Sequence, residues 1–173
     1  MALQRYAALL RGVSPMNAKM PALKRSFEDA GFSDVATLLS SGNVVFSARA
    51  ASDATLQREA EAAMQAGLGR SFQTIVRRLD ALRRLLEADP FSAFPLPAGR
   101  KRVITFLRAA AAAQIEPPVH FADACIHAVR DREIFSSCLP GDKGTAFMRH
   151  LEKTFGKDVT TRTWDTVAKI ASR

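Results

Sequence analysis

Three short polar segments contain the residues of this chain that are best suited to bind a ligand. The first is a loop that follows a predicted strand and precedes a predicted helix, whose free N–H groups favour an anion. The second is a tight turn, whose backbone N–H groups can face a ligand. The third joins an Arg to the single Trp, and these two side chains can stack on a base or sugar. The candidate ligand-binding residues are therefore Arg11, Asn17, Lys19, Ser41, Gly42, Asn43, Arg162 and Trp164.

Each segment also has a purely structural interpretation. Asn17 can cap the following helix, as Asn often does, while Arg11 forms an ion pair. Gly42 can adopt the positive φ that a hairpin turn requires, because glycine has no side chain. Trp164 can pack in the core while Arg162 pairs with a carboxylate. The sequence leaves both interpretations open at each segment.

Patterns of known catalytic or metal sites are absent from the sequence. It contains no G-x-S-x-G, P-loop, G-x-G-x-x-G or H-E-x-x-H motif. The widely spaced His120, His127 and His150 are expected to be structural or exposed. Cys125 and His127 share a strand face at i, i+2, which alone does not indicate a nucleophile and its base. Without a Cys-x-x-Cys pair or a Cys/His cluster, we predict no metal and no cofactor.

The two cysteines lie on the two strands of a predicted hairpin. If its turn has two residues, Asp131 and Arg132, Cys125 faces Cys138 in a non-hydrogen-bonded pair and a disulfide is geometrically possible. A three-residue turn, or a reducing cytosol, leaves two free thiols instead. Both alternatives stay open.

The charge of the chain is basic and unevenly placed. The 173 residues carry a net charge of +8, and the segment from Arg70 to Arg108 holds nine basic and three acidic residues. A local basic field favours polyanions such as nucleic acid, or anionic metabolites, although the same excess also occurs as solvated surface. No apolar run approaches the roughly 20 residues of a membrane helix, and no signal peptide is recognisable. We expect no membrane partner and a cytoplasmic location.

The order of the predicted elements is typical of an α+β protein. The first half shows the β-α-β-β-α-β order of a ferredoxin-like sandwich, with strands over 3–11, 35–39, 44–47 and 72–77 and helices over 20–30 and 54–68. The second half reads as a helix after Leu79, a proline-rich loop over 90–100, a strand over 102–107, helical turns over the alanine run 109–113, a hairpin of 124–129 with 133–138, a helix over 144–155, and a last helix capped by Thr163. We predict a ferredoxin-like subdomain over 1–78 and a second, smaller α+β subdomain over 79–173.

Six short motifs stand in the order typical of one known bacterial family. They are Tyr6–Gly12, Met20–Leu23, Gly31–Val35, Ser41–Phe46, Asp89–Phe91 and Thr161–Val167. On these motifs the chain resembles the bacterial domain-of-unknown-function family 1697. The resemblance implies an α+β fold with a ferredoxin-like first half. It supplies no activity, because none is established for that family.

Two departures from the family pattern affect the candidate segments. After Arg-Gly the family usually has Ile-Asn-Val-Gly-Gly-x-Asn, whereas Val13–Asn17 reads Val-Ser-Pro-Met-Asn and lacks the paired glycines. A backbone anion site in this loop would be altered or lost. After Trp164 the family has Asn where this chain has Asp165, whose negative charge should weaken an anion contact at Arg162.

These observations support three hypotheses about function. The leading one is a cytosolic protein that binds, without catalysis, a polyanion or a phosphate-bearing ligand. The second is a small-molecule enzyme that orients its substrate with Arg11, Asn43 and Arg162, which requires a pocket with a perturbed acid or base. The third is a protein-interaction module with an apolar patch around Phe91, Phe94 and Leu96, or with an exposed edge strand. Oligomeric state does not follow from the sequence.

The hypotheses also differ in which segments form one site. In a simple ferredoxin-like topology we expect the loop that ends at Lys19 and the turn at Gly42 to lie at opposite ends of the sheet. The segment Arg162–Asp165 is then the alternative partner of the loop Arg11–Lys19.

Overall fold

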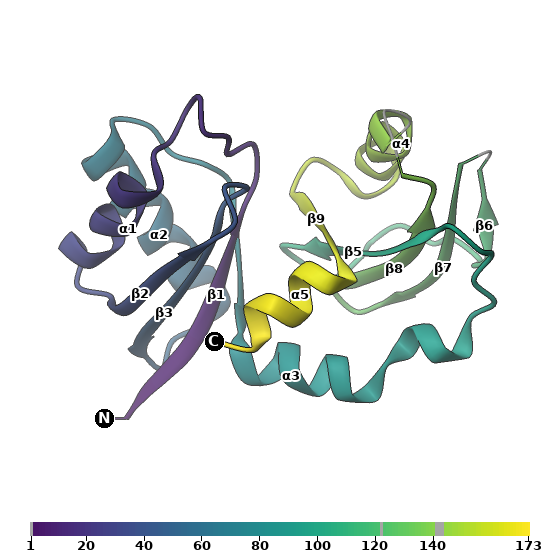
Figure 1. Cartoon of the computed structure of the whole chain (residues 1–173), viewed down its shortest axis with the longest axis horizontal. Helices are drawn as coiled ribbons and strands as arrows, with labels where there is room; N and C mark the ends of the chain where they lie inside the picture. The colour runs from purple at the N-terminus through teal and green to yellow at the C-terminus, as the bar shows by residue number, and fades with distance from the viewer. Residues whose placement is uncertain (1, 122, 141–143) are drawn as a thin grey trace. The chain divides into compact units, whose positions relative to one another are not determined.

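The structure is a computed structural model that describes residues 2–121, 123–140 and 144–173, and it has the predicted α+β class (Figure 1). The chain divides into two units, Met1–Arg84 with Lys169–Arg173, and Leu85–Ala168. The first unit thus continues past the predicted boundary at residue 78 and includes the last residues of the chain. The subdomain assignment itself stays a prediction.

The first unit is built around a four-stranded antiparallel sheet. Its elements are β1 (Leu3–Leu10), α1 (Met20–Asp29), β2 (Ser33–Leu38), β3 (Asn43–Arg49), α2 (Asp53–Leu68) and β4 (Thr74–Arg78). The strands lie in the order β2-β3-β1-β4, and each neighbouring pair is antiparallel. The order of elements along the chain agrees with the predicted order. The ferredoxin-like assignment stays a prediction.

Helices α1 and α2 cover one face of this sheet (Figure 1). Side chains of the strands alternate between faces, so Tyr6 and Phe46 point to the helices and stack with ring centroids 5.8 Å apart. Phe27 of α1 adds a ring 5.7 Å from Phe46. Helix α2 begins at a Ser52 cap, whose Oγ accepts from the N–H of Thr55 at 3.1 Å. Asp53 is the first residue of the helix.

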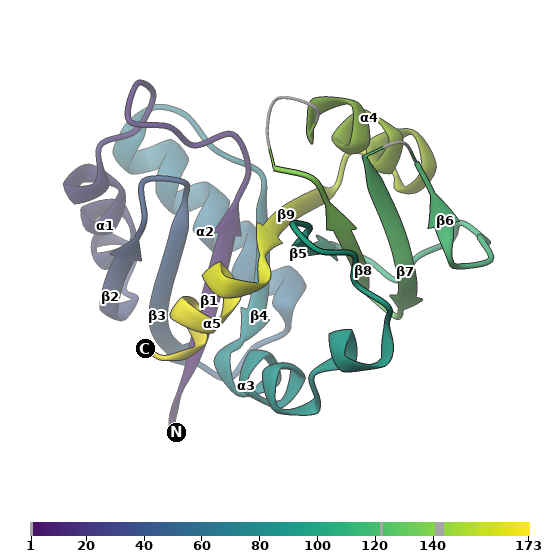
Figure 2. The ribbon, with the colours of Figure 1, turned by 45° about the vertical axis from the view of Figure 1, so that its right-hand side comes forward.

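The second unit contains a five-stranded antiparallel sheet. Helix α3 (Leu79–Ala88) leads into it, followed by the short 3-10 helix η1 (Pro90–Ala93), β5 (Lys101–Leu107), β6 (Val119–His120), β7 (Ala124–Arg130), β8 (Glu133–Cys138), α4 (Gly144–Phe155), β9 (Val159–Thr163) and α5 (Trp164–Ala171). The strands lie in the order β6-β7-β8-β5-β9. Helix α4 lies across one face of the sheet and buries Phe147 and Leu151 against it (Figure 2).

One prediction for the second unit is wrong, and one of its strands was not predicted. The alanine run 109–113 is not helical, because the Ala111 N–H donates to the carbonyl of Asp131 at 3.1 Å instead of to its own segment. A run this short cannot offset the cost of helix nucleation. The segment Val159–Thr163, for which no regular element was predicted, is a strand that pairs with β5. The predicted cap at Thr163 is confirmed, since its Oγ1 accepts from the Thr166 N–H at 3.2 Å.

Among the described helices, none combines the length and the apolar character that crossing a bilayer would require.

Candidate functional site

The loop after β1 and the turn after β2 lie at the same end of the first sheet, so their expected separation is wrong. The two strands that carry them are antiparallel neighbours, with Leu9 facing Asn43. The end of β1 therefore meets the start of β3. The Leu10 N–H donates to the Gly42 carbonyl at 2.8 Å, and a Cβ added to Gly42 would lie 2.9 Å from Cβ atoms of Leu10 and Val13.

The amides of this end bind the protein's own backbone. Asn17 accepts from the Ser14 N–H through Oδ1 and donates to the Gly12 carbonyl through Nδ2, both at 2.8 Å. It therefore orders the loop rather than capping α1, whose N-cap is Lys19. Asn43 is fully buried, and its Nδ2 donates to the Leu38 carbonyl at 3.1 Å. Both amides therefore form hydrogen bonds to the chain itself.

Arg162 and Trp164 belong to the second unit, where both side chains contact other residues of the same unit. The Trp164 ring is 6% exposed and lies 5.0 Å from the ring of Phe91, so little of its face is left for a base. Nη1 of Arg162 donates to Thr160 Oγ1 at 2.8 Å and to the Thr161 carbonyl at 3.0 Å. Burial lowers the pKa of Arg162 to about 10, which still leaves it charged at neutral pH. That this segment meets the Arg11–Lys19 loop stays a prediction.

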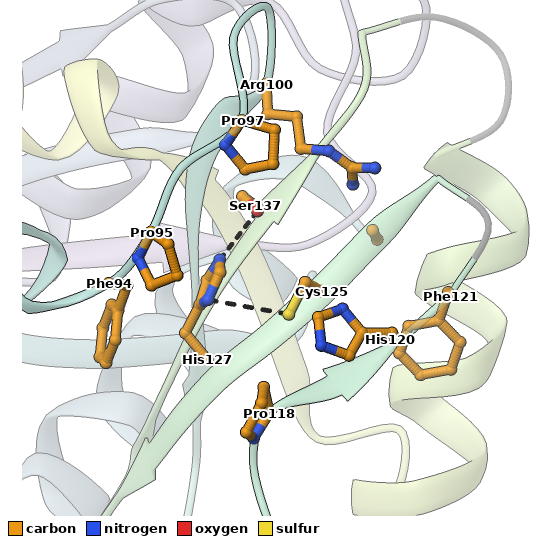
Figure 3. A pocket seen from close by; sticks show the side chains of 11 residues that line it. Phe94, Pro95, Pro97, Arg100, Pro118, His120, Phe121, Cys125, His127 and Ser137 are labelled. Carbon is orange, nitrogen blue, oxygen red and sulfur yellow. Dashed lines mark hydrogen bonds between the residues drawn. The ribbon is translucent and has the colours of Figure 1, made fainter.

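A cavity of about 330 Å³ opens in the second unit, beside the β7–β8 hairpin (Figure 3). Most of its wall is apolar and comes from the proline-rich loop before β5, from β6 and from the start of β7. Its polar groups are the side chains of an arginine, two histidines, a cysteine and a serine. We call it the apolar cavity; it is lined by Phe94, Pro95, Pro97, Arg100, Pro118, His120, Phe121, Ala124, Cys125, His127 and Ser137.

A β-bulge in β7 brings three of these polar groups together. The hairpin has a two-residue turn, one of the alternatives left open, but the register shifts between Ile126 and Ala128, so that Cys125 faces Ser137. The extra residue is His127, and bulges re-aim side chains in this way. Without the shift Cys125 would face Cys138. Both cysteines are free thiols, and Cys138 instead packs on the side of the sheet that faces α4.

The ring of His127 is held on three sides (Figure 3). Its Nε2 lies 2.8 Å from Ser137 Oγ, and its Nδ1 lies 3.7 Å from Cys125 Sγ. The ring of Phe94 stacks on it, with the centroids 5.1 Å apart and the planes 13° from parallel. Burial lowers the pKa of His127, and the positive charges of His120 and Arg100 lower it further, so the neutral imidazole predominates at pH 7.

The thiol of Cys125 is protonated at neutral pH. Burial raises its pKa, and the nearby charge of Arg100 offsets only part of that effect. The side chain is 5% exposed and lines the apolar cavity. A buried thiol of this kind reacts only when a base takes its proton, and Nδ1 of His127 is the basic atom beside it.

A second hollow of about 310 Å³ shares Arg100 with the apolar cavity. We call it the cationic hollow; it is lined by Arg100, Lys101, Arg102, Thr163, Trp164 and Asp165. Asp165 forms an ion pair with Arg102. Its carboxylate lies 3.8 Å from Arg102, with 84% of its side chain exposed. Three consecutive cations thus face one depression with one exposed carboxylate.

Not every cation of the basic segment from Arg70 to Arg108 is at the surface. Arg77 is 2% exposed and donates to the carbonyl of Val76. Arg78 and Arg83 both pair with Asp80 at 3.7 Å. These residues belong to the first unit, whereas the three cations of the cationic hollow belong to the second.

The apolar patch predicted around Phe91 is packed inside the second unit. Phe91 is 2% exposed, and its ring contacts those of Phe94, Phe135 and Trp164 at centroid distances of 5.0–6.2 Å. Leu96 remains 37% exposed. The packed loop argues against the interaction module based on this patch.

The family model described as a protein of unknown function, DUF1697, matches residues 3–135. The chain belongs to this family. A similar solved structure is that of the conserved bacterial protein SP0830 from Streptococcus pneumoniae, whose sequence is 20% identical. The match covers 99% of this chain and 98% of the SP0830 chain, with a TM-score of 0.69. At that identity the likeness shows the fold alone. No curated protein matches the chain.

Sequence reasoning passed over the polar residues of the apolar cavity in this DUF1697 protein. The i, i+2 spacing of Cys125 and His127 is visible in the sequence, but the pairing with Ser137 is not, because the bulge that aligns it leaves no pattern in the sequence. Arg100 was counted only as one charge among nine. Within residues 2–121, 123–140 and 144–173, no group of three or more His, Cys, Asp or Glu side chains is placed to hold a metal ion.

Proposed function

We propose that the protein binds a small ligand that carries a phosphate group and an apolar or aromatic part, and that it does so within residues 85–168. The observation that carries the proposal is the position of Arg100, which lines both the apolar cavity and the cationic hollow. A ligand that spans the two would place its ring among the apolar walls and its anion on the cations.

The apolar cavity has the properties of a small-molecule site. Ligand pockets are usually a few hundred Å³ in volume and mostly apolar, with a few polar groups that fix orientation, and this cavity has about 330 Å³. The ring of Phe94 and the prolines 95, 97 and 118 offer flat apolar surface to an aromatic or aliphatic group.

The cationic hollow supplies the anion contacts. A guanidinium binds phosphate or carboxylate through two parallel hydrogen bonds, and Lys adds a point charge. Arg102 already forms an exposed ion pair with Asp165, with Nη2 and Oδ1 3.8 Å apart. A phosphate carries more charge and more acceptor oxygens than one exposed carboxylate, so it competes for the same cations.

Calorimetric titration with phenyl phosphate tests the proposal, with phenol and inorganic phosphate as the two half-ligands. Phenyl phosphate should bind more tightly than either half. Arg100→Gln should weaken it at least about tenfold, because a charged hydrogen bond is lost. Arg84→Gln, a change of an exposed arginine in the first unit, is the matched control and should have no effect. Equal affinities in the Arg100 and Arg84 variants would contradict the proposal.

The same variants distinguish binding of a polyanion such as nucleic acid from binding of a small ligand. Labelled single-stranded RNA should bind weakly and lose its affinity steeply with salt. RNA binding that survives Arg100→Gln while phenyl phosphate fails to bind would replace the small-ligand proposal by the polyanion one.

A further inference from the structure

We propose that Cys125 is a nucleophile served by His127 as general base, and that it accepts the acyl group of an acyl phosphate bound in the apolar cavity. The inference rests on the proposed function, since it places a phosphate-bearing ligand at Arg100. It goes beyond binding, because it assigns a covalent step and the residues that perform it.

The first argument is the arrangement of the three polar groups. A nucleophile, a base and a third group that orients the base are the parts that covalent catalysis needs. Cys125 Sγ, the His127 ring and Ser137 Oγ follow one another at 3.7 and 2.8 Å. In the tautomer that carries its proton on Nε2, His127 donates to Ser137 and turns the lone pair of Nδ1 to the thiol.

The second argument is that His127 cannot easily turn away. The Phe94 ring covers one of its faces, and both ring nitrogens have polar neighbours. When a base is already held in its reactive orientation, no conformational entropy has to be lost to reach that orientation during the reaction. The neutral state of His127 at pH 7, which its lowered pKa favours, is the state that accepts a proton.

The third argument selects the thiol over the hydroxyl. Ser137 is fully buried, whereas Cys125 is 5% exposed. A sulfur nucleophile is also intrinsically stronger than a neutral hydroxyl. Ser137 is therefore the positioning residue and Cys125 the group that touches the substrate.

The step balances without an oxidant or a reductant. As Sγ of Cys125 bonds to the carbonyl carbon, the thiol proton passes to Nδ1 of His127. The bond from that carbon to the phosphate oxygen then breaks. Inorganic phosphate leaves beside Arg100, whose charge stabilises it, and the proton on His127 is released to the phosphate or to solvent. The product is a thioester on Cys125, and attack by water on the thioester, with His127 as base, returns the free thiol and a carboxylic acid.

The apolar cavity also fits the acyl part of such a substrate. Its walls of Phe94, Phe121 and three prolines suit an aromatic or branched apolar acyl group. The ligand that the proposed function requires and the electrophile that Cys125 requires thus have the same two halves.

Benzoyl phosphate is the probe, with intact-mass analysis and peptide mapping as the readouts. Cys125 should become benzoylated at least about 100-fold faster than Cys138, because general-base catalysis contributes at least about that factor. The change Cys125→Ser should abolish the thioester, Cys138→Ser should leave it unchanged, and His127→Gln should slow its formation about 100-fold. Far-UV circular dichroism and thermal unfolding verify that each variant is folded.

The outcomes separate this inference from the proposed function. Phenyl phosphate cannot acylate, so its calorimetric affinity reports binding alone. Binding of phenyl phosphate without preferential acylation of Cys125 would overturn the nucleophile and leave the proposed function intact. If Cys125→Ser does not fold, unchanged benzoylation in the folded His127→Gln protein would also overturn it. Loss of both binding and acylation would overturn both.

Discussion

The loop end of the first unit and the apolar cavity of the second unit both gather amide, hydroxyl or charged side chains, and they use them in opposite ways. At the loop end Asn17 and Asn43 donate to backbone carbonyls of their own segments. In the cavity Cys125, His127 and Ser137 bind one another and line an open space. Polar residues in loops therefore do not identify a ligand site until their own backbone partners have been counted.

Substitution of Gly42 should have the largest effect and should be confined to the loop end. Gly42 has φ +86°, and an added Cβ would lie 2.9 Å from Leu10 and Val13. We expect Gly42→Ala to lower the free energy of unfolding by about 3 kcal/mol, because backbone strain and overpacking add. Urea unfolding followed by far-UV circular dichroism measures it.

Gly12→Ala is the matched control. Gly12 has a similar φ of +81°, but a Cβ there meets nothing within 4 Å. It should cost only about 1 kcal/mol, the price of the left-handed conformation alone. Equal losses in the two variants would mean that the packing of the loop on the turn contributes nothing. Benzoylation of Cys125 should be the same in both folded variants.

The pH dependence of His127 should give an intermediate effect in the cavity. Its pKa is lowered first by burial, then by His120 and Arg100; Cys125 and Ser137 face its two ring nitrogens. By nuclear magnetic resonance its ring should titrate below the ordinary value of about 6.5. Arg100→Gln should move the midpoint upward while leaving most of the burial effect.

The same lowered pKa makes stability depend on pH with a definite sign. Below about pH 6.5 the His127 side chain binds a proton in the unfolded chain, whereas in the folded chain it stays neutral until the pH reaches its lowered pKa. The contribution of His127 is therefore fully present above that pH and is lost as the pH falls toward the lowered pKa. His127→Gln should remove this part of the slope, and a midpoint at or above the ordinary value would contradict the assignment.

Asp165→Asn should have the smallest effect on stability and should strengthen anion binding in the cationic hollow. Asp165 and Arg102 form an exposed pair at 3.8 Å. Such pairs contribute at most about 1 kcal/mol, so the free energy of unfolding should change by about 0.5 kcal/mol or less. The freed Arg102 should raise the affinity for phenyl phosphate about twofold at low salt, and added salt should remove the gain. A weaker affinity would show that Asp165 helps to hold Arg102 in place.

The fold was predictable where local patterns decide it. The hairpin of β7 and β8, with its turn at Asp131, and helix α2 with its end at Gly69 follow from strand alternation and turn chemistry. The strand Val159–Thr163 was not recognised, because its polar threonines and Arg162 suggested a ligand-binding segment. Threonine is also β-branched and favours strands, and partners on β5 decided the outcome.

The candidate site was much less predictable than the fold. Its residues come from four separate segments, around Phe94, Pro118, Cys125 and Ser137. Only the pairing of β6, β7 and β8 brings them together, and a bulge shifts that pairing by one residue. A sequence without aligned relatives contains no signal for such a shift.

The bulge at His127 has a consequence for redox chemistry. In a regular hairpin Cys125 and Cys138 would form a cross-strand pair, and an oxidant could close them into a disulfide. The one-residue shift turns Cys138 to the α4 side of the sheet, while Cys125 lines the apolar cavity on the other side. Because the two thiols lie on opposite sides of the sheet, they cannot reach each other to form a disulfide. A thiol-specific reagent should therefore detect two free thiols in the protein even when no reductant is present.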